Sequence, residues 1–449
     1  MSLIATDKRR IIIGLGQTGL SCARYFKRRG QAFAVCDTRE TPEAAIAFRA
    51  EFPDVPLRLG ALDPDWLGSA DELVIGPGVD KRHPAISQAV AAGVPLIGDI
   101  DLFCREAQAP VVAITGSNAK STVTTLVGLM ARAAGISVGV GGNIGTPALD
   151  LLEQPAELYV LELSSFQLET THELRAAAAT VLNVSPDHLD RYDGMQDYVL
   201  TKQRIYRGAA VVLANRDDPL TQPLLAQGVT LRQFGIGRPD LKDYGLCLHE
   251  GSHWLCRGLE PLLPVDALKI RGQHNQANAL AALALAEAVN IPLAPAVRAL
   301  RDFPGLEHRC QWVADIAGVG YFNDSKGTNV GATLAALEGL GPTLPAGKRL
   351  VLLAGGVGKE QQFSDLSAPL QRYGRALVLF GRDAEQIAAE VEGVEIHFAA
   401  SLDDAVEMAR HISEAGDLVV LSPACASFDM FAGYAERGRA FVSAVEARA

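Results

Sequence analysis

Two loops in the first third of the chain have the residue types and spacing of phosphate-binding sites. One is Thr-Gly-Ser-Asn-Ala-Lys-Ser-Thr, residues 115–122, which follows the apolar run 111–114 and precedes an apolar-periodic segment that stops at Gly135. A strand, a short polar loop and a helix N-terminus together present backbone N–H groups and the positive end of a helix dipole to an anion. Lys120 is placed to reach the outer phosphates, and the Ser121 hydroxyl to hold Mg²⁺. The segment predicts a site for a nucleoside triphosphate.

This loop departs from the phosphate-loop pattern G-x-x-x-x-G-K-[ST]. Ile114 stands in place of the first glycine, and Ala119 in place of the glycine before the lysine. The Cβ of Ala119 can crowd a phosphate or resist the backbone φ that the loop needs. An ordinary strand-to-helix turn capped by a serine is the alternative, but the strand–loop–helix context favours phosphate binding.

The other loop is Gly14-Leu-Gly-Gln-Thr-Gly19, which lies between an expected strand (10–13) and an expected helix (20–29). A second expected strand ends at Asp37, about 20 residues further on, which completes the dinucleotide-binding fingerprint. Three interpretations remain open from these residues alone. The loop binds NAD(P) in an oxidoreductase, or holds the diphosphate of a nucleotide-linked substrate, or is a tight turn that binds nothing.

Four polar residues in the middle of the chain are further candidates. Glu162 lies in an otherwise apolar strand, and because a lone buried charge is costly, a metal or cationic partner is expected. His188 and Asn143 lie in polar loops after other strands, where either role, solvated or functional, fits. Lys202 lies within an expected helix (194–207), and its local sequence predicts only a solvated charge.

Two later motifs bear on binding. Asn275 and Asn278 open a long Ala- and Leu-rich helix at i,i+3 spacing, so both amides can lie on one face. The segment 247–256 contains two cysteines and two histidines in the spacing C-x-H-x₃-H-x₂-C. That spacing matches no standard zinc pattern, and the period-2 alternation around 250–252 predicts a β-hairpin instead.

Composition limits the class of protein. The chain has 449 residues, which is enough for about three domains of roughly 150 residues each. It is 48% hydrophobic and 21% charged, as expected of a soluble α/β enzyme, and its net charge of −11 argues against non-specific nucleic-acid binding. No apolar run approaches the ~20 residues of a membrane span, so no membrane partner is expected. Seven scattered cysteines without C-x-x-C fit a reducing cytoplasm.

The order of expected elements predicts an α/β fold in three domains, because strands and helices alternate along nearly the whole chain. Residues 1–98 form a small Rossmann-like unit, and residues 99–305 a central P-loop ATPase-like parallel sheet. Residues 306–449 form a second Rossmann-like unit, in which a last helix begins near Phe428. In this third domain three polar segments (323–329, 355–359 and 422–427) each follow a strand and so fall on one edge of the sheet.

Together these motifs resemble those of the ATP-dependent Mur ligases, and within them the D-glutamate-adding members. The resemblance covers the whole chain. Its most specific parts are G-L-G-Q-T-G with C-D-T-R, E-L-S-S-F-Q-L-E, N-V-S-P-D-H-L-D-R-Y, G-Q-H-N-Q-A-N-A, N-D-S-K-G-T-N, and S-P-A-C-A-S-F-D with E-R-G.

The resemblance implies a ligase of cytoplasmic peptidoglycan precursor synthesis, hence of cell-wall growth, cell shape and division. It would use ATP and two Mg²⁺ ions to join D-glutamate to UDP-N-acetylmuramoyl-L-alanine through an acyl phosphate. The first domain would then bind the uridine diphosphate and no NAD. The chain would act as a monomer, with no nucleic-acid partner.

The same resemblance implies a role for each matching residue. The catalytic and metal-binding set is Lys120, Ser121, Glu162, His188 and Lys202, the last carried as a carbamate. ATP would contact Gly116, Ser117, Asn118, Ala119, Lys120, Ser121, Thr122, Asn275, Asn278, Arg309 and Asp324. The UDP-substrate would contact Gly16, Gln17, Thr18, Asp37, Thr38, Arg39, Gly78, Asn143, Gln167 and His188, and D-glutamate would contact Lys326, Thr328, Lys359, Ser427 and Phe428.

Three positions depart from the family pattern. Ala119 replaces a glycine, Val357 stands where Asp is frequent, and Gly76 stands where Ser is frequent before Pro-Gly. Three alternatives to the ligase remain. An NAD-dependent dehydrogenase leaves the 115–122 loop unexplained, and a nucleotide-sensing protein would bind ATP without turnover. A ligase for another amino acid is the third, although the D-N-P-R signature of a diaminopimelate adder is absent.

Overall fold

The computed structural model describes residues 8–189, 191–223, 228–358 and 361–448. Contacts divide the chain into two compact units. The first comprises Met1–Val184, His188–Phe234 and Ala281–Ala296, and the second comprises Ser185–Asp187, Gly235–Leu280 and Val297–Ala449. Each unit is described by itself.

The N-terminal part of the first unit is a parallel five-stranded sheet in the order β3-β2-β1-β4-β5. Alternate residues of β1 face opposite sides, because side chains alternate along a strand. Ile11 and Ile13 pack with α3 and α4, whereas Ile12 packs with α1 and α2. The strands are β1 (Arg10–Ile13), β2 (Phe33–Asp37), β3 (Leu57–Leu59), β4 (Glu72–Ile75) and β5 (Leu96–Ile97), and the helices are α1 (Gln17–Arg28), α2 (Ala45–Glu51), α3 (Pro64–Gly68) and α4 (Pro84–Ala91).

The sequence missed β3 and α3. Strand β3 has three residues and none of them is buried, so it carries no apolar run. Helix α3 has five residues and is too short for a periodic signal, although Asp63 caps it by accepting hydrogen bonds from two backbone N–H groups. Both elements are therefore fixed by tertiary pairing more than by local pattern.

The remainder of the first unit contains parallel strands in the order β11-β10-β9-β6-β8-β7. Strand β6 is fully buried between β9 and β8, so the loop that follows it opens at the carboxyl edge of an interior strand. The strands are β6 (Val111–Thr115), β7 (Val138–Gly142), β8 (Leu158–Glu162), β9 (Ala178–Val181), β10 (Val211–Asn215) and β11 (Thr230–Phe234). The helices are α5 (Asp99–Glu106), α6 (Lys120–Ala133), α7 (Ser165–Leu168) and α8 (Met195–Gln203), with 3-10 turns η1 (Ala148–Glu153), η2 (Arg204–Tyr206) and η3 (Pro219–Thr221).

The second unit begins with an antiparallel meander, β12 (Tyr244–His249), β13 (Ser252–Arg257) and β14 (Glu260–Pro264). The β12–β13 pairing confirms the expected hairpin. His253 pairs with Leu248, and so points to the opposite face from Cys247 and His249. Cys247 and Cys256 form a disulfide with a Cα–Cα distance of 6.1 Å, which the sequence did not predict. No cluster of three or more metal-ligating side chains occurs among the residues described.

Turn η4 (Val265–Ala267) and helices α9 (Gln273–Ala288) and α10 (Leu293–Asp302) follow along the chain. In the part of the chain that the structure covers, no helix is both long enough and apolar enough to cross a membrane.

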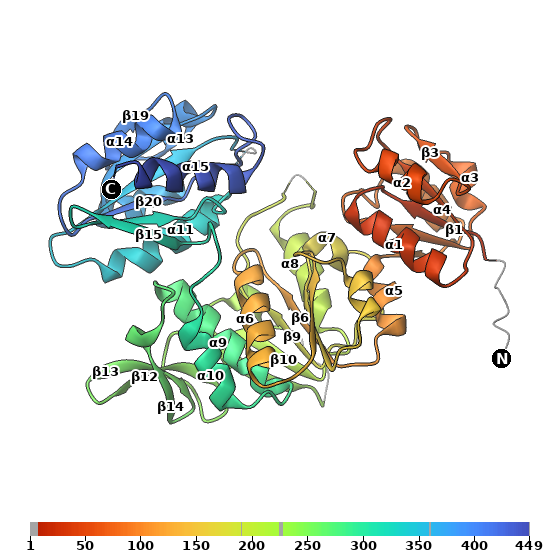
Figure 1. Cartoon of the computed structure of the whole chain (residues 1–449), viewed down its shortest axis with the longest axis horizontal. Helices are drawn as coiled ribbons and strands as arrows, with labels where there is room; N and C mark the ends of the chain where they lie inside the picture. The colour runs from red at the N-terminus through yellow and green to blue at the C-terminus, as the bar shows by residue number, and fades with distance from the viewer. Residues whose placement is uncertain (1–7, 190, 224–227, 359–360, 449) are drawn as a thin grey trace. The chain divides into compact units, whose positions relative to one another are not determined.

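The C-terminal part of the second unit is a six-stranded sheet in the order β15-β16-β20-β17-β18-β19, parallel except for the edge strand β15. Helices cover both faces (Figure 1). Leu350 and Leu352 pack with α11, α12 and α13, whereas Val351 and Leu353 pack with α14 and α15. The strands are β15 (Gln311–Ile316), β16 (Val319–Asn323), β17 (Leu350–Gly355), β18 (Gly374–Phe380), β19 (Glu395–Phe398) and β20 (Leu418–Leu421). The helices are α11 (Val330–Leu340), α12 (Ser367–Tyr373), α13 (Ala384–Glu390), α14 (Leu402–Ile412) and α15 (Tyr434–Glu446), with turns η5 (Gly341–Thr343) and η6 (Ser364–Leu366).

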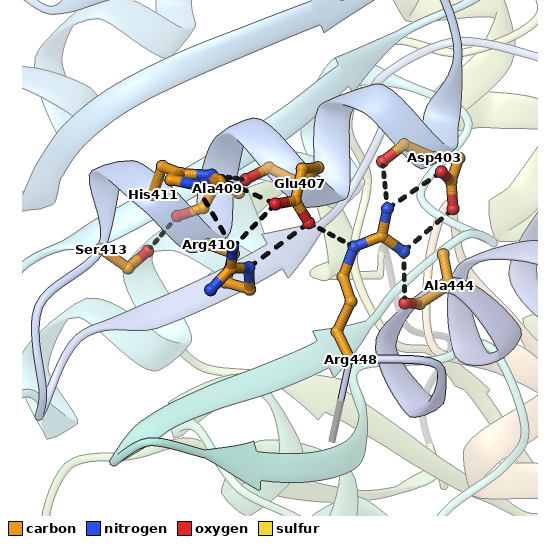
Figure 2. Close-up of polar contacts among 8 residues, drawn as sticks. All are labelled: Asp403, Glu407, Ala409, Arg410, His411, Ser413, Ala444 and Arg448. Carbon is orange, nitrogen blue, oxygen red and sulfur yellow. Dashed lines mark hydrogen bonds and ion pairs between the residues drawn. The ribbon is translucent and has the colours of Figure 1, made fainter.

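An ion-pair cluster joins α14 to the end of α15 (Figure 2). Arg448 donates to both carboxylate oxygens of Asp403, at 3.0 and 2.9 Å, and its Nε donates to Glu407 at 2.6 Å. Arg410 pairs with the other side of Glu407 at 2.8 Å. The last helix begins at Tyr434 and not near Phe428, because the intervening residues form turns around Ser427.

Candidate active site

The loop after β6 has the geometry of a phosphate cradle at the start of α6. Ala119 is the N-cap residue and has φ 66°, in the left-handed region, which is the conformation that made this alanine a concern in the sequence. Asn183 holds the loop from behind: its carbonyl accepts from the N–H of Ser117 at 2.9 Å, and its side chain exchanges hydrogen bonds with the backbone of Asn118. The left-handed backbone of Ala119 costs roughly 1–2 kcal/mol, and the hydrogen bonds with Asn183 together with the preceding strand β6 keep the loop in this conformation.

Two lysines meet at one carbonyl of this loop. Lys120 Nζ donates to the carbonyls of Gly116 and Ser117 at 2.8 and 3.0 Å, and Lys202 Nζ donates to the same Gly116 carbonyl at 2.9 Å. Lys202 is only 2% exposed and lies over the Tyr198 ring at 4.5 Å. The local prediction of a solvated Lys202 was wrong, because α8 packs its side chain beneath the phosphate loop. Two cations at the mouth of a helix N-terminus make a strong anion site.

Glu162 ends β8 directly beside the phosphate-loop strand, since it pairs with Ile114 of β6. It is 3% exposed, and its Oε1 accepts a hydrogen bond from Asn143 Nδ2 at 2.8 Å. Its other oxygen, Oε2, is buried without a hydrogen-bond partner among the described residues. A buried carboxylate oxygen left in this state is costly, so the position suits a cation ligand.

His188 lies on an exposed loop after β9 and has φ 54°, another left-handed residue. Its ring meets Phe166 of α7 edge-on, with centroids 4.9 Å apart. Arg191 stacks on the same Phe166 ring at 4.5 Å and pairs with Glu169 at 3.1 Å. The His188 loop is thus held against α7, which follows Glu162 in sequence.

The N-terminal loop lines a cavity of about 330 Å³ at the carboxyl edge of the first sheet. Seven residues expected to contact the UDP-substrate border it together: Gly16, Gln17, Thr18, Asp37, Thr38, Arg39 and Gly78. Asn143, Gln167 and His188, which were expected to contact the same substrate, are not in its lining. Gln167 instead caps α7 with Ser164 and donates to the buried Asp99 at 3.2 Å.

Both carboxylate oxygens of Asp37 accept hydrogen bonds from the protein. It accepts from the N–H of Leu15 at 2.6 Å and from the N–H and guanidinium of Arg39 at 2.8 Å. Burial would raise the pKa of Asp37, but the hydrogen bonds from Arg39 and Leu15 outweigh burial and lower it. In a dinucleotide-binding fold the acid at this point binds ribose hydroxyls. Here it orients Arg39, whose side chain is 58% exposed, so the arrangement argues against the NAD interpretation.

In the second unit, the two asparagines at the start of α9 are adjacent and buried. Asn278 Nδ2 donates to Asn275 Oδ1 at 3.1 Å, and Asn275 Nδ2 donates to the Arg271 carbonyl at 2.8 Å. The expectation that both amides lie on one helix face is confirmed.

Asp324 follows β16 and is enclosed by protein. It accepts from Ser422 Oγ at 2.7 Å and from the N–H of Cys310 at 3.1 Å, and burial raises its pKa to about 7. Arg309 lies between His308 and Cys310, both of which have positive φ, 62° and 48°. The loop that carries Arg309 is therefore tied down by the Asp324 carboxylate.

Four of the five residues expected to hold D-glutamate lie on loops of the C-terminal sheet. Lys326 Nζ lies over the Tyr434 ring at 4.1 Å, and the N–H of Thr328 donates to the Lys326 carbonyl. Ser427 is 2% exposed and Phe428 is 75% exposed. Lys359 lies outside the described residues. These loops follow β16 and β20, which are neighbours in the sheet, as the one-edge prediction requires.

Sequence reasoning assigned no role to three well-connected residues. Asn183 supports the phosphate loop, Arg191 supports the His188 loop, and Arg437 is fully buried beneath the loops of the C-terminal sheet. Their motifs, N-V-S-P, D-R-Y and E-R-G, were visible in the sequence. Burial of Arg437 was not, because arginine in a helix is usually solvated.

Comparisons with known proteins agree with this geometry. Three family models match successive parts of the chain: Mur ligase MurD-like N-terminal domain at residues 8–98, Mur ligase middle domain at 114–286, and Mur ligase glutamate ligase domain at 308–425.

Curated relatives match over nearly the full length. A UDP-N-acetylmuramoylalanine–D-glutamate ligase from Pseudomonas aeruginosa is 58% identical over 447 residues, which is 99% of each chain. A protein of the same name from Hahella chejuensis is 52% identical over 448 residues, the whole of both chains.

A solved structure of a MurF ligase from Thermotoga maritima, in complex with ADP, has a TM-score of 0.62 at 16% identity and covers 99% of each chain. A pseudomurein peptide ligase from Methanothermus fervidus has a TM-score of 0.60 at 18% identity, over 98% of this chain and 99% of the other. At these identities the structures show a shared fold, whereas the sequence relatives and family models go further. On that evidence the chain, an α/β protein of three domains, belongs to the ATP-dependent Mur ligase family.

Proposed function

We propose that this protein is an ATP-dependent ligase that joins D-glutamate to the carboxyl group of UDP-N-acetylmuramoyl-L-alanine. The observation that carries the proposal is the 58% identity, over 99% of both chains, to a relative that bears this activity in its name. The reaction belongs to peptidoglycan precursor synthesis. Because ATP and nucleotide-linked precursors are cytoplasmic metabolites, we place it in the cytoplasm, and we infer a monomer.

The work is divided among three segments. Residues 1–98 would bind the UDP-substrate, with its diphosphate at Gly16, Gln17 and Thr18. Residues 99–305 would bind ATP, and residues 306–449 would bind D-glutamate. The cavity of about 330 Å³ beside Gly16 and Arg39 supports the first assignment, since loop N–H groups at a helix start suit a diphosphate.

The central residues fit Mg²⁺. The buried, unpartnered Oε2 of Glu162 is the observation that supports a cation there, and Ser121, His188 and a carbamylated Lys202 would complete two sites. The buried position of Lys202 beside the phosphate loop supports that modification, which would turn this cation into an anionic metal ligand and leave Lys120 as the cation of the loop. When bound, Mg²⁺ neutralises charge on the phosphate oxygens.

The protein's own groups then explain the chemistry. A carboxylate is a poor electrophile, so the substrate carboxylate first attacks the γ-phosphoryl group of ATP and releases ADP. Lys120, at the start of α6, stabilises the charge that develops on the transferred phosphoryl oxygens. The amine of D-glutamate next attacks the acyl phosphate, and the tetrahedral intermediate collapses to an amide and inorganic phosphate. His188 and Lys202 are electrostatic residues in this scheme and not nucleophiles.

A phosphate-release assay tests the proposal. Purified protein with ATP, Mg²⁺ and UDP-N-acetylmuramoyl-L-alanine is offered D-glutamate, L-glutamate, L-lysine or meso-diaminopimelate in turn. We expect phosphate release only with D-glutamate, and a loss of at least about 10³-fold in kcat for Lys120→Ala. Release that is equal with all four amino acids, or unchanged in Lys120→Ala, would refute the assignment.

A further inference from the structure

Arg437 is the largest fully buried side chain of the described structure, with 0% exposure. It lies in the first turn of α15 and makes four hydrogen bonds. Its Nε donates to Ser325 Oγ at 3.0 Å, and its Nη2 donates to the carbonyls of Ser325 and Cys425 at 2.8 and 3.1 Å. Its Nη1 donates to the carbonyl of Gly355 at 3.4 Å.

These acceptors lie past the carboxyl ends of three adjacent parallel strands. Ser325 follows β16, Gly355 ends β17, and Cys425 follows β20, which lies between the other two. The carboxyl edge of such a sheet is where ligands bind in α/β folds. One planar guanidinium therefore joins three neighbouring loops at this edge of the sheet.

Arg437 has no ion-pair partner among the described residues; all four of its acceptors are neutral oxygens. The nearby Asp324 instead accepts from Ser422 and from the N–H of Cys310. Burial lowers the pKa of Arg437 to about 10, so it remains protonated at neutral pH. Hydrogen bonds to neutral oxygens do not require a charged donor. A positive charge at this edge of the sheet would, in contrast, favour the binding of an anionic ligand.

Two features lie in the segments next to this side chain. Gly438 has no room for a Cβ, which would lie 2.3 Å from His308 Nδ1. Val357 and Ala426 form a two-bond backbone bridge, so the loops after β17 and β20 are already joined to each other. The third loop, residues 324–328, contacts the segment after β20 through the hydrogen bond from Ser422 Oγ to Asp324, and the two hydrogen bonds from Arg437 to Ser325 tie it in addition to the side chain that reaches Gly355 and Cys425.

We propose that Arg437 is a positioning residue for the amino-acid substrate, because it sets the spacing between the loop of Lys326 and Thr328 and the loop of Ser427 and Phe428. A dicarboxylate amino acid that contacts both loops is recognised only when that spacing is correct. The inference rests on the proposed function, since it takes D-glutamate as the ligand of these loops. Arginine is needed because its fork of five N–H groups reaches three segments, whereas a lysine ammonium is a compact point donor.

The test is steady-state kinetics of Arg437→Lys, which keeps the charge and loses the fork. We expect kcat/KM for D-glutamate to fall about 10- to 100-fold, because a displacement of about 1 Å has consequences of that size. The KM values for ATP and for UDP-N-acetylmuramoyl-L-alanine stay within about twofold of wild type. A structural defect alone would move all three substrates together.

Arg448→Lys is the matched control, because it alters an arginine that lies just past the other end of the same helix and bonds none of the three loops. It should leave kcat/KM for D-glutamate unchanged. If Arg437→Lys does not yield folded protein, Ser325→Ala removes the Nε acceptor, together with the hydrogen bond from Ser325 Oγ to the Tyr434 carbonyl, and should give a smaller loss with the same selectivity.

Wild-type kcat/KM for D-glutamate in Arg437→Lys or Ser325→Ala, or equal losses for all three substrates, overturns the inference and leaves the proposed function standing. A wild-type protein that never uses D-glutamate overturns the proposed function, and this inference with it.

Discussion

Arg437 and Arg448 lie at the two ends of one helical segment and are bonded in opposite ways. Arg448 is partly exposed and pairs with the carboxylates of Asp403 and Glu407 (Figure 2). Arg437 is fully enclosed and bonds only neutral oxygens. A partly exposed arginine between two acids holds two helices together, and its charge is balanced by the two carboxylates. A buried arginine without an acidic partner carries a desolvation penalty. This penalty is why we infer a functional role for Arg437 and only a structural role for Arg448.

The same contrast separates two acids. Glu407 is partly exposed, and both of its carboxylate oxygens accept hydrogen bonds from arginines: the bonds from Arg410 and Arg448 lower its pKa to about 2. Asp324 is buried and bonds a hydroxyl and one N–H, and burial raises its pKa to about 7. The contribution of Glu407 to the free energy of unfolding is therefore lost as the pH falls, whereas that of Asp324 is lost as the pH rises. This difference makes the comparison measurable.

The largest expected effect comes from removing the buried arginine. Arg437→Ala leaves the Gly355, Ser325 and Cys425 carbonyls without this donor, at roughly 1–3 kcal/mol for each group that finds no other partner. We expect the C-terminal sheet to lose about 3 kcal/mol or more of its free energy of unfolding. Hydrogen exchange of the β17 and β20 amides measures the loss. Exchange as slow as in wild type would show that this arginine carries no stability.

An intermediate effect is expected from Asp324. Folding raises the pKa of this carboxyl from about 3.8 in the unfolded chain to about 7. Its contribution to stability is therefore complete below pH 3.8 and is lost as the pH rises through about 7. Between pH 4 and 7, the free energy of unfolding of the C-terminal sheet should therefore fall in wild type more than in Asp324→Asn. Urea unfolding at several pH values checks this. Parallel pH profiles for the two proteins would contradict the buried, raised carboxyl.

The smallest effect is expected at the surface cluster. Arg448→Ala should lower Tm by about 2–4 °C at most, and by less in high salt, because exposed ion pairs contribute little. Glu407 has a lowered pKa, so its contribution is present above about 4.5 and is lost as pH falls toward 2. Thermal melts at pH 7 and pH 3, with and without salt, measure both. A drop in Tm as large as that of Arg437→Ala would erase the distinction between the two ends of α15.

Local sequence determined a large part of this protein. The bounds of β1 match the predicted strand 10–13 residue for residue, because a continuous apolar β-branched run strongly favours a buried strand in an α/β chain. The three-domain α/β fold and the family also followed from motifs whose spacing reflects strand–loop–helix chemistry. The left-handed strain at Ala119 was foreseen, since only the missing glycine had to be noticed.

Tertiary structure decided the rest. The burial of Lys202 and the short elements β3 and α3 depend on partners distant in sequence, and the disulfide between Cys247 and Cys256 depends on the pairing of β12 with β13. The environment of Arg437 is the clearest case, because its acceptors lie 12 to 112 residues away. A sequence specifies which residues carry charge, but only packing decides which of these charges are removed from water. The cost of that desolvation is why a residue such as Arg437 has a large effect on stability.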